Sequence, residues 1–455
     1  MLQRLRRRLN SGRGINPTRI VAGSFAVIIL IGTLLLMLPV SSRSGESVGF
    51  VTALFTATSS TCVTGLILAD TWLTWSLFGQ IVLLLLIQLG GLGFMTLVTL
   101  VSLALRRRIG LSERLLMVST LNLNDMDGVV RVVRHALTGT FLLEGMGAAV
   151  LSLCFIPRFG LGRGIWYGVF HAVSAFCNAG FDLMGEDGPF SSLVFYDGHP
   201  LVLLIVMTLI VIGGLGFFVW EDIWRQRRWK SLSLYTRIVL VMTGFLIVTG
   251  AVFFFFAEYG NQATLGAMPG WKKGLNALFQ SVTLRTAGFN TIDQAGLKDS
   301  SQVMSILFML IGGSSGSTAG GLKTATVAVL LLALRAGLRG SEEVTLRGRS
   351  ISHRQVMNCF TLVLTAVVLF LAASMLVSLV EARPFLHCAF EVASAMGTVG
   401  ITVGITPSLS VFSRLLIIAL MYMGRVGLLS FSIAFLVRGK KKGKLKYPSF
   451  DIMIG

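Results

Sequence analysis

The sequence predicts an all-α membrane protein with four tandem repeats, each made of a helix, a re-entrant pore helix and a second helix. Eight spans would then surround a central pore. Three observations lead to this fold class. Of the 455 residues, 54% are hydrophobic and 13% charged, with a mean hydropathy of +0.80, which leaves too little polar surface for a water-soluble globule. One glycine motif occurs four times at a near-constant period, and the basic residues gather in separate blocks.

The repeated motif is a short polar stretch that follows an apolar segment and ends in glycine. Its four copies lie 115, 108 and 112 residues apart and end at Gly65, Gly180, Gly288 and Gly400. A second glycine cluster follows each copy after 25, 33, 24 and 24 residues, at Gly90, Gly213, Gly312 and Gly424. Close helix packing explains a single glycine, but four matched pairs indicate one structural unit used four times.

The positive charges alternate with acidic loops along the chain. The net charge is +19, and Lys and Arg concentrate in residues 1–19, 106–134, 225–237, 335–354 and 438–446. This alternation is typical of the positive-inside rule and predicts cytoplasmic basic blocks and two cytoplasmic termini. These blocks could also contact anionic lipid head groups. Nucleic acid is not expected as a partner.

Apolar runs of span length occur twice in each repeat. They cover residues 20–40, 76–105, 136–156, 201–220, 236–257, 303–334, 356–380 and 411–437. Residues 50–60 are apolar but too short to cross. Because the blocks at 1–19 and 106–134 lie on one side, an even number of crossings separates them, so the short segment must turn back. The same reasoning applies to the later repeats.

The repeats divide the chain into six parts. These are a cytoplasmic basic tail (1–19), repeat 1 (20–105), repeat 2 with its preceding cytoplasmic loop (106–223), repeat 3 (224–335) with an intramembrane loop (312–321), repeat 4 (336–438) and a C-terminal tail (439–455). No cleavable signal peptide is expected, because the first apolar run has full span length and lacks a cleavage site. Residues 447–455 could fold back into a dimer interface, which we favour, or form a loose tail.

The four motifs predict a cation filter. A half-helix that enters from outside directs the negative end of its dipole at the membrane centre, and its irregular return is tolerated where it lines a watery cavity. Glycine adopts the required backbone angles at low cost, and a ring of carbonyls can replace the hydration shell of K⁺. The predicted filter comprises Cys62, Val63, Thr64, Gly65, Cys177, Asn178, Ala179, Gly180, Arg285, Thr286, Ala287, Gly288, Gly397, Thr398, Val399 and Gly400. The expected K⁺ ligands are the backbone carbonyls of Val63, Thr64, Asn178, Ala179, Thr286, Ala287, Thr398 and Val399.

The second glycine cluster of repeat 3 predicts a gate. Each glycine in a helix costs about 1 kcal/mol relative to alanine, so the span should break into a loop that obstructs the pore below the filter. The loop residues assigned to the gate are Gly312, Gly313, Ser314, Ser315, Gly316, Ser317 and Thr318. A phosphate-binding loop at 316–324 is a weak alternative, because Leu322 separates Gly321 from Lys323 and no strand precedes.

Arg425 is the charged residue of the corresponding cluster in repeat 4. An unpaired charge at this depth costs at least about 2.5 kcal/mol, so the side chain should have a partner. We expect its guanidinium to donate to loop carbonyls and to add a barrier to cations. The alternative is an arginine that snorkels to the interface.

These motifs resemble those of a known family. TCVTG (61–65), NAGF (178–181), RTAGFN (285–290) and GTVGIT (397–402) look like the four filter motifs of the Trk/Ktr/HKT superfamily of cation transporters. Further matches are QLGGLGF (88–94), residues 311–324 and GRVG (424–427). The resemblance covers essentially the whole chain and is strongest to the KtrB branch, the membrane subunits of bacterial Ktr K⁺ uptake systems. Gly65 agrees with the K⁺-preferring members, whereas Cys62 and Cys177 stand where other polar residues are common.

The resemblance implies the pore-forming subunit of a K⁺ uptake system in the bacterial plasma (inner) membrane. It also implies a homodimer with one pore in each protomer, and a cytosolic ring of RCK-type subunits, KtrA, that binds ATP or ADP. No cofactor is expected on this chain, which has no dinucleotide-binding unit. Arg285 is expected to support the third filter through backbone carbonyls. The preference for K⁺ over Na⁺ and any Na⁺ dependence stay open.

Two other classes of function fit the sequence less well. A twelve-span secondary carrier also has glycine-interrupted spans, but its repeats are inverted, whereas these four units run in one direction. An enzyme is not expected, because no catalytic motif occurs. The five cysteines are scattered and predict neither disulfides nor a metal site. Glu144 and Gln88, both within spans, could link helices or support a pore helix.

Overall fold

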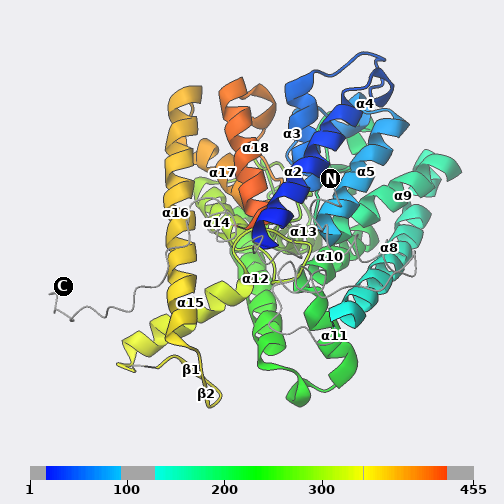
Figure 1. The fold of residues 1–455 in the computed structure, drawn as a ribbon. Coiled ribbons are helices and arrows are strands. Elements are labelled where there is room, and N and C mark those ends of the chain that lie inside the picture. The colour runs from blue at the N-terminus through cyan, green and yellow to red at the C-terminus, as the bar shows by residue number, and fades with distance from the viewer. Residues whose placement is uncertain (1–16, 94–128, 342, 428–455) are drawn as a thin grey trace, which may run out of the picture.

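The computed structural model describes residues 17–93, 129–341 and 343–427. Helices dominate this part of the chain, and its strands form one hairpin, β1 (Thr345–Leu346) and β2 (Arg349–Ser350). The helices follow one plan four times: a first helix, a short pore helix and a second helix (Figure 1). The predicted all-α fold class of four tandem repeats is therefore confirmed.

The first two repeats lie in the N-terminal half. Repeat 1 contains α2 (Pro17–Leu36), the pore helix α3 (Phe50–Thr61), the short α4 (Thr71–Thr74) and α5 (Leu77–Leu92). Repeat 2 contains α8 (Val129–Phe159), the pore helix α9 (Leu161–Phe176), α10 (Pro200–Leu215) and α11 (Phe217–Gln226). Short 3₁₀ turns lie at η1 (Pro39–Ser41), η2 (Met184–Glu186), η3 (Val194–Tyr196) and η4 (Trp229–Ser231).

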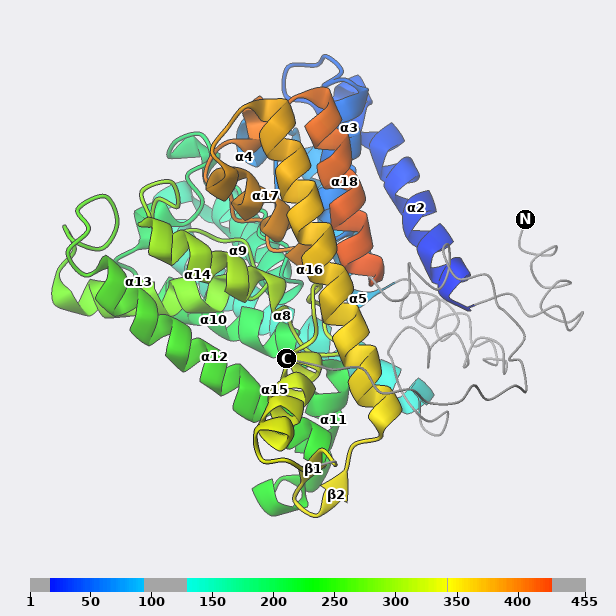
Figure 2. The same cartoon turned by 90° about the vertical axis from the view of Figure 1, so that its left-hand side faces the viewer.

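The last two repeats have the same order of elements. Repeat 3 contains α12 (Leu234–Glu258), the pore helix α13 (Gly270–Thr283), α14 (Asp299–Leu310) and α15 (Thr324–Leu338). Repeat 4 contains α16 (His353–Glu381), the pore helix α17 (Phe385–Gly397), the turn η5 (Thr406–Ser408) and α18 (Val411–Val426). The β1–β2 hairpin joins the two repeats at the end of the molecule where α11 and the start of α12 also lie (Figures 1 and 2). We call this end the basic end.

The first helices and the pore helices differ in how far they are buried in the protein. The helices α2, α8, α12 and α16 are each long and apolar enough to cross a bilayer, and about two thirds or more of each apolar stretch is not buried. The pore helices are instead surrounded by protein. Each carries a phenylalanine with no exposed surface, nine or ten residues before the filter glycine: Phe55, Phe170, Phe279 and Phe390.

Repeat 4 closes on repeat 1. In both views α18 lies beside α2 and α3, so the first and last repeats are neighbours (Figures 1 and 2). The hydroxyl of Tyr422 on α18 donates to the carbonyl of Ala22 on α2 at 2.6 Å. The repeats therefore form a ring around a common axis.

The second helices are shorter than the sequence predicts. We expected continuous spans at 76–105, 201–220 and 411–437, but α5 ends before Gly93, α10 before Gly216 and α18 before Gly427. These glycines have φ of 77°, 95° and 94°, a conformation in which a helix cannot continue. At Gly216 the next helix, α11, leaves at 93° to α10. The third repeat breaks between α14 and α15, as predicted.

Candidate functional site

Each pore helix carries, at or near its carboxyl end, a hydroxyl residue that holds the following filter segment. The backbone N–H of Thr64 donates to the carbonyl of Ser59 at 2.8 Å, and its counterparts do the same in the other repeats. The side-chain hydroxyl adds a second bond: that of Ser59 accepts from Gly65 N–H at 3.1 Å, and that of Ser174 donates to the carbonyl of Phe181 at 2.7 Å. The equivalent residues are Ser59, Ser174, Thr283 and Ser394. They fix the turn from helix to filter.

The filter segments share an unusual backbone. The glycine has a positive φ in every repeat, 93° at Gly65, 67° at Gly180, 89° at Gly288 and 93° at Gly400. The residue two positions earlier is also left-handed, with φ between 52° and 63°: Val63, Asn178, Thr286 and Thr398. The residue between them is not. Valine and threonine rarely adopt this conformation, at a cost of about 1–3 kcal/mol each, so the surrounding protein must impose it. Because φ alternates in sign, successive carbonyls can face one side of the strand, where an extended strand would point them apart.

The four glycines meet on one axis. Each lies against the carbonyl oxygen that precedes the next glycine in the ring, so close that a side chain has no room. A Cβ on each of the first three would lie 2.6 Å from that oxygen, and one on Gly400 would lie closer still. The pairs are Gly65 with Ala179, Gly180 with Ala287, Gly288 with Val399 and Gly400 with Thr64. The last pair closes the ring, and these four carbonyls are among the predicted K⁺ ligands.

Buried polar side chains in three pore helices brace the chain beyond the filter. Glu391 on α17 accepts from Thr402 Oγ1, from the Val403 N–H at 3.2 Å and from Thr406 Oγ1 at 2.6 Å. Gln280 on α13 and Gln294 exchange two hydrogen bonds of 2.8 and 3.0 Å. Glu391 therefore fixes the outer end of filter 4, and Gln280 fixes that of filter 3.

The second filter is braced in the same way by a histidine. His171 on α9 sits nine residues before Gly180, as Glu391 sits nine before Gly400. Its Nε2 accepts from the Leu183 N–H at 3.4 Å, and its Nδ1 contacts the Tyr167 carbonyl at 2.7 Å. His171 has no exposed surface.

A polar cluster behind filter 2 joins two repeats. Gln88 on α5 donates to both carboxylate oxygens of Glu144 on α8 at 3.1 Å. The thiol of Cys177 donates to Gln88 Oε1 at 3.7 Å and to Glu144 Oε1 at 3.8 Å. The sequence left two roles open for Gln88 and Glu144. Their mutual hydrogen bonds link two helices, and the contacts with Cys177 also connect them to the end of the pore helix α9.

Arg285 does not act as expected. The hydrogen bond that the structure gives its guanidinium runs to the hydroxyl of Thr243 on α12 at 3.3 Å, away from the filter carbonyls. Its side chain is 6% exposed. The interpretation that it supports the third filter through backbone carbonyls was wrong. The reason is geometric, since the backbone turn places this side chain against the first helix of its own repeat.

The second glycine clusters let the second helices approach the pore helices. A Cβ on Gly90, Gly213 or Gly424 would overlap the carbonyl oxygen of the residue four positions before the filter glycine. Those residues are Thr61, Phe176 and Met396, in the same order. Close packing is thus the role of these three glycines, and the matched spacing reflects a repeated helix contact.

The loop between α14 and α15 is pinned at its base. Gly312 N–H donates to Leu322 O at 2.8 Å and Leu322 N–H donates to Leu310 O at 3.2 Å. The hydroxyls of Ser314 and Thr324 lie 3.0 Å apart and form a further hydrogen bond. The predicted intramembrane loop is therefore a closed loop whose apex lies near Ser315 and Gly316.

The loop docks on the break between α10 and α11. Ser314 N–H donates to Gly214 O at 3.0 Å and Thr318 N–H donates to Gly213 O at 3.3 Å, which satisfies carbonyls that a helix end leaves free. In return, the first N–H of α11, that of Phe217, donates to Gly316 O at 2.9 Å. The hydroxyl of Tyr235 on α12 donates to the carbonyl of Ser315 at 3.4 Å.

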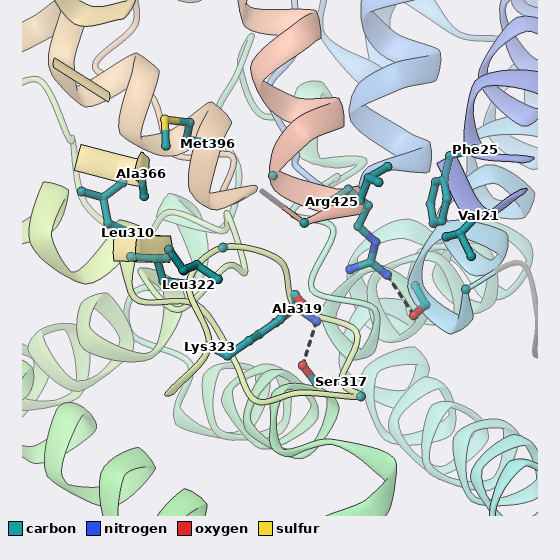
Figure 3. A pocket seen from close by; sticks show the side chains of 18 of the residues that line it. Val21, Phe25, Leu310, Ser317, Ala319, Leu322, Lys323, Ala366, Met396 and Arg425 are labelled. Carbon is teal, nitrogen blue, oxygen red and sulfur yellow. Dashed lines mark hydrogen bonds between the residues drawn. The ribbon is translucent and has the colours of Figure 1, made fainter. Parts of the chain in front are cut away.

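Two cationic side chains donate hydrogen bonds to carbonyls of the loop. Arg425 donates to the carbonyls of Thr318 and Gly90, and to that of Gly91 at 3.1 Å. Lys323 donates from Nζ to Ala319 O at 2.8 Å. Figure 3 shows Arg425 reaching from α18 toward the loop and Lys323 extending along it.

Both cations line a cavity of about 250 Å³ below the filter. Its wall combines apolar side chains of α2, α14 and α16 with loop residues and the breaks at Gly93 and Gly427. Among the described residues that line it, Lys323 and Arg425 are the charged ones. The predicted partner for Arg425 is thus found, while Lys323 was missed as part of this site.

The remaining candidate residues are placed as follows. Glu343 is exposed, while Asp125, Asp127, Glu342 and the tail at 439–455 lie outside the described residues. All five cysteines are described and free. In the described part of the chain, no group of three His, Cys, Asp or Glu side chains is arranged to hold a metal ion.

The filter hydroxyls, the braces and Lys323 were not singled out from sequence. The hydroxyls had a visible signal, because a Ser or Thr stands five or six residues before each filter glycine. The braces had a weaker one, since Gln280 and Glu391 are polar within apolar segments. Lys323 had one as well, as a cation directly after the glycine cluster.

Comparison with known proteins agrees with this geometry. Residues 10–443 match the family model TrkH, described as a cation transport protein. The chain is 40% identical over 460 residues to the potassium/sodium uptake protein NtpJ of Enterococcus hirae, covering 100% of this chain and 99% of that protein. It is 37% identical to the Ktr system potassium uptake protein B of Bacillus subtilis, covering 96% and 97%. The fold is similar to the crystal structure of the potassium transporter TrkH from Vibrio parahaemolyticus, with a TM-score of 0.74 at 17% identity, covering 92% and 84%.

Proposed function

The chain belongs to the TrkH family of cation transport proteins and is a potassium or sodium uptake transporter, and from this we propose that it is the pore-forming subunit of a bacterial K⁺ uptake system. K⁺ passes on the axis between the four filter segments. The uptake proteins of Enterococcus hirae and Bacillus subtilis carry potassium in their names, and the former also carries sodium. K⁺ is the main transported ion in this proposal, and Na⁺ competes with K⁺ for the filter.

The single observation that carries the proposal is the closed ring of glycine and carbonyl contacts. Four carbonyl oxygens, one from each repeat, lie at one level around one axis, and four glycines leave no side chain there. Carbonyl rings of this kind can substitute for the hydration shell of K⁺. Each pore helix points its carboxyl end at this level, where the helix dipole favours a cation. Flow is driven by the membrane potential, about 2.3 kcal/mol per charge per 100 mV.

The loop at 312–321 and Arg425 form the gate. The loop lies below the filter, and Arg425 and Lys323 add positive charge to the cavity that a K⁺ ion would have to enter. An unpaired cation there repels K⁺, so passage needs the loop and both cationic groups to move aside. We assign the basic end of the molecule to the cytoplasm, with both termini on that side of the plasma membrane.

The regulatory partner of this proposal is a cytosolic ring that binds ATP or ADP and docks at the basic end. The relatives in Bacillus subtilis are named as components of a Ktr system, which supports a multi-component transporter. The protomer contains a complete ring of four repeats, so a homodimer of this chain would have two pores.

Complementation tests the transport function. A bacterium deficient in K⁺ uptake should grow at low K⁺ when it expresses this chain together with a cytosolic ring partner, and more slowly with this chain alone. A Gly65→Ala variant, expressed to the same level in the membrane, serves as the inactive control. The proposal would be contradicted if the unmutated chain, with and without the ring partner, gave neither growth nor ⁸⁶Rb⁺ uptake.

The gate is tested separately. Arg425→Ala removes three hydrogen bonds to Thr318, Gly90 and Gly91, and deletion of residues 314–318 removes the loop apex. Both variants should raise ⁸⁶Rb⁺ flux in proteoliposomes, by about fivefold or more, since hydrogen bonds to charged groups are worth about 1.5–3 kcal/mol. Unchanged flux in both would refute the gate and leave the filter assignment standing.

A further inference from the structure

The segment between α10 and α12 carries an exposed surface at the basic end that belongs neither to the filter nor to the gate loop. Residues 223–231 are exposed without interruption. Trp224 is 75% exposed, Trp229 50% and Ile223 38%. Four cations stand among them: Arg225, Arg227, Arg228 and Lys230. We call residues 223–231 the surface patch.

The patch has no acidic side chain, and the two acids that precede it are hydrogen-bonded to residues outside the patch. No Asp or Glu occurs between positions 223 and 233. Glu221 contacts His135 on α8 at 2.7 Å, and Asp222 accepts from Ser233 N–H at 2.9 Å. The Arg227 guanidinium lies 5.9 Å from the centre of the Trp224 ring, so the aromatic and cationic groups share one surface.

The position of the patch in the fold indicates a membrane surface. The preceding helix α10 is a second helix of its repeat, and the following helix α12 is long and apolar enough to cross a bilayer. A segment that joins two such helices on one side lies at the membrane interface. The bend of 93° at Gly216 turns α11 across the direction of α10. Tryptophan with Lys and Arg is the composition of an interfacial segment that binds anionic lipid.

The chain contacts the apex of the gate loop on both sides of the patch, through Phe217 and Tyr235. At its N-terminal side, Phe217 N–H donates to Gly316 O at 2.9 Å. At its C-terminal side, the Tyr235 hydroxyl donates to Ser315 O at 3.4 Å. The bond between Asp222 and Ser233 ties the two sides together. A contact that fixes the patch therefore restrains Ser315 and Gly316 in the position seen here, where the loop lies below the filter.

We propose that the surface patch binds anionic phospholipid head groups and that this contact holds the gate loop in its obstructing position. The lipid charge complements four basic side chains, while Trp224, Trp229 and Ile223 enter the head-group layer. Anionic lipid stabilises the obstructing position because displacement of the loop apex breaks the bonds to Phe217 and Tyr235 or pulls the patch from the surface. A ligand shifts such an equilibrium only through a difference in affinity for the two positions. The inference about flux rests on the proposed function, whereas the lipid contact does not.

Fluorescence quenching tests the contact without any transport. The purified full chain is placed in vesicles of phosphatidylcholine and phosphatidylglycerol (3:1), with bromine atoms on one lipid at a time. After normalisation to the mole fraction of the brominated lipid, phosphatidylglycerol should quench tryptophan more strongly than phosphatidylcholine. This preference should vanish in the variant W224F/W229F and remain in W271F, which removes a tryptophan that is 56% exposed on α13. Equal quenching by both lipids in the wild type overturns the proposal.

Flux in the same vesicles tests the coupling to the gate. Wild-type ⁸⁶Rb⁺ flux should be lower in vesicles with phosphatidylglycerol than in pure phosphatidylcholine, by about threefold or more. The variant R225Q/R228Q should lose this dependence. The variant R347Q/R349Q removes two exposed arginines from the β1–β2 hairpin at the same end and should keep it. A lipid preference in quenching with equal flux in both vesicles would overturn the coupling, and no wild-type flux in either would count against the proposed transport function alone.

Discussion

The four filter segments and the four breaks in the second helices both depend on glycine, yet they keep the fourfold plan to different degrees. At the filter, every repeat has the same left-handed glycine, the same left-handed residue two positions before it and the same contact with the next repeat. At the breaks, a left-handed glycine also occurs in every repeat, 28, 36, 28 and 27 residues after the filter glycine: Gly93, Gly216, Gly316 and Gly427.

The chain takes a different course after these breaks. After Gly216 it turns into α11, and around Gly316 it forms the pinned loop. Under the proposed function, the upper layer, at the filter, repeats because its four parts would meet a single ion in the same way. The lower layer, at the breaks, differs between repeats 2 and 3. Under the proposed function one loop is enough to obstruct the pore, and carbonyls of the other repeats support it. A side chain added to the upper layer should therefore reduce transport, whereas the loss of a support in the lower layer should increase it.

The largest effect is expected from a side chain in the ring. Gly288→Ala places a Cβ 2.6 Å from the Val399 carbonyl oxygen at a residue with φ of 89°. The strained backbone alone costs about 1–3 kcal/mol, and the overlap adds to it, so ⁸⁶Rb⁺ uptake should fall by at least about tenfold.

A matched control lies on the pore helix of the same repeat. Gly274 on α13 has no atom within 4 Å of the position of an added Cβ. Gly274→Ala should therefore keep wild-type uptake. Similar losses in both variants would mean that uptake reports helix stability and not ring geometry.

A smaller effect is expected from the lower layer. Lys323→Met removes the bond to Ala319 O and one of the two positive charges at the cavity below the filter. The closed loop loses a hydrogen bond, and the cavity repels cations less. The ⁸⁶Rb⁺ flux in proteoliposomes should therefore rise by about fivefold. Lys272→Met removes a lysine that pairs with Asp197 at 3.2 Å in a different part of the molecule and should leave flux unchanged. A decrease in Lys323→Met would show that this lysine aids conduction.

The sequence was sufficient to predict the repeat plan. A position that lies against another backbone requires glycine, so glycine occurs at the same position in every copy of the motif. It also predicted that the helix breaks in repeat 3, where five glycines lie within ten residues. It did not reveal the breaks at Gly93, Gly216 and Gly427. A single glycine in an apolar run is equally compatible with a continuous helix, and only its φ in the fold distinguishes the two.

Side-chain partners were harder to predict than backbone positions. The role of Arg425 followed from the cost of a lone charge at that depth, whereas its acceptors on Thr318, Gly90 and Gly91 come from two other repeats. Arg285 was misassigned because its neighbours in sequence are filter residues, while its neighbour in space is Thr243. Contacts between repeats depend on how the ring closes, which periodicity does not determine.

A smaller effect on transport is expected from the buried polar side chains that brace the filter segments. Glu391→Gln keeps one oxygen acceptor but replaces the other with a donor, so one of the bonds from Thr402 and Thr406 is lost. The outer end of filter 4 should loosen, and the preference for K⁺ over Na⁺, measured by competition with ⁸⁶Rb⁺ uptake, should fall by about twofold to threefold. Glu46→Gln, at an exposed position, is the control. A lower rate at unchanged preference would mean that Glu391 supports stability and does not position the filter.

The smallest effect on uptake is expected from substitution of a glycine that lies in neither the filter nor the breaks. Gly244 lies on the outer side of α12, is exposed, and has no atom within 4 Å of an added Cβ. Alanine is the better helix former by about 1 kcal/mol at most, so Gly244→Ala should raise the midpoint of thermal unfolding in detergent slightly and leave uptake at the wild-type rate. If this variant lowered uptake as strongly as Gly288→Ala, glycine at any position would be essential, and the distinction between a ring that excludes side chains and a helix that tolerates them would fail.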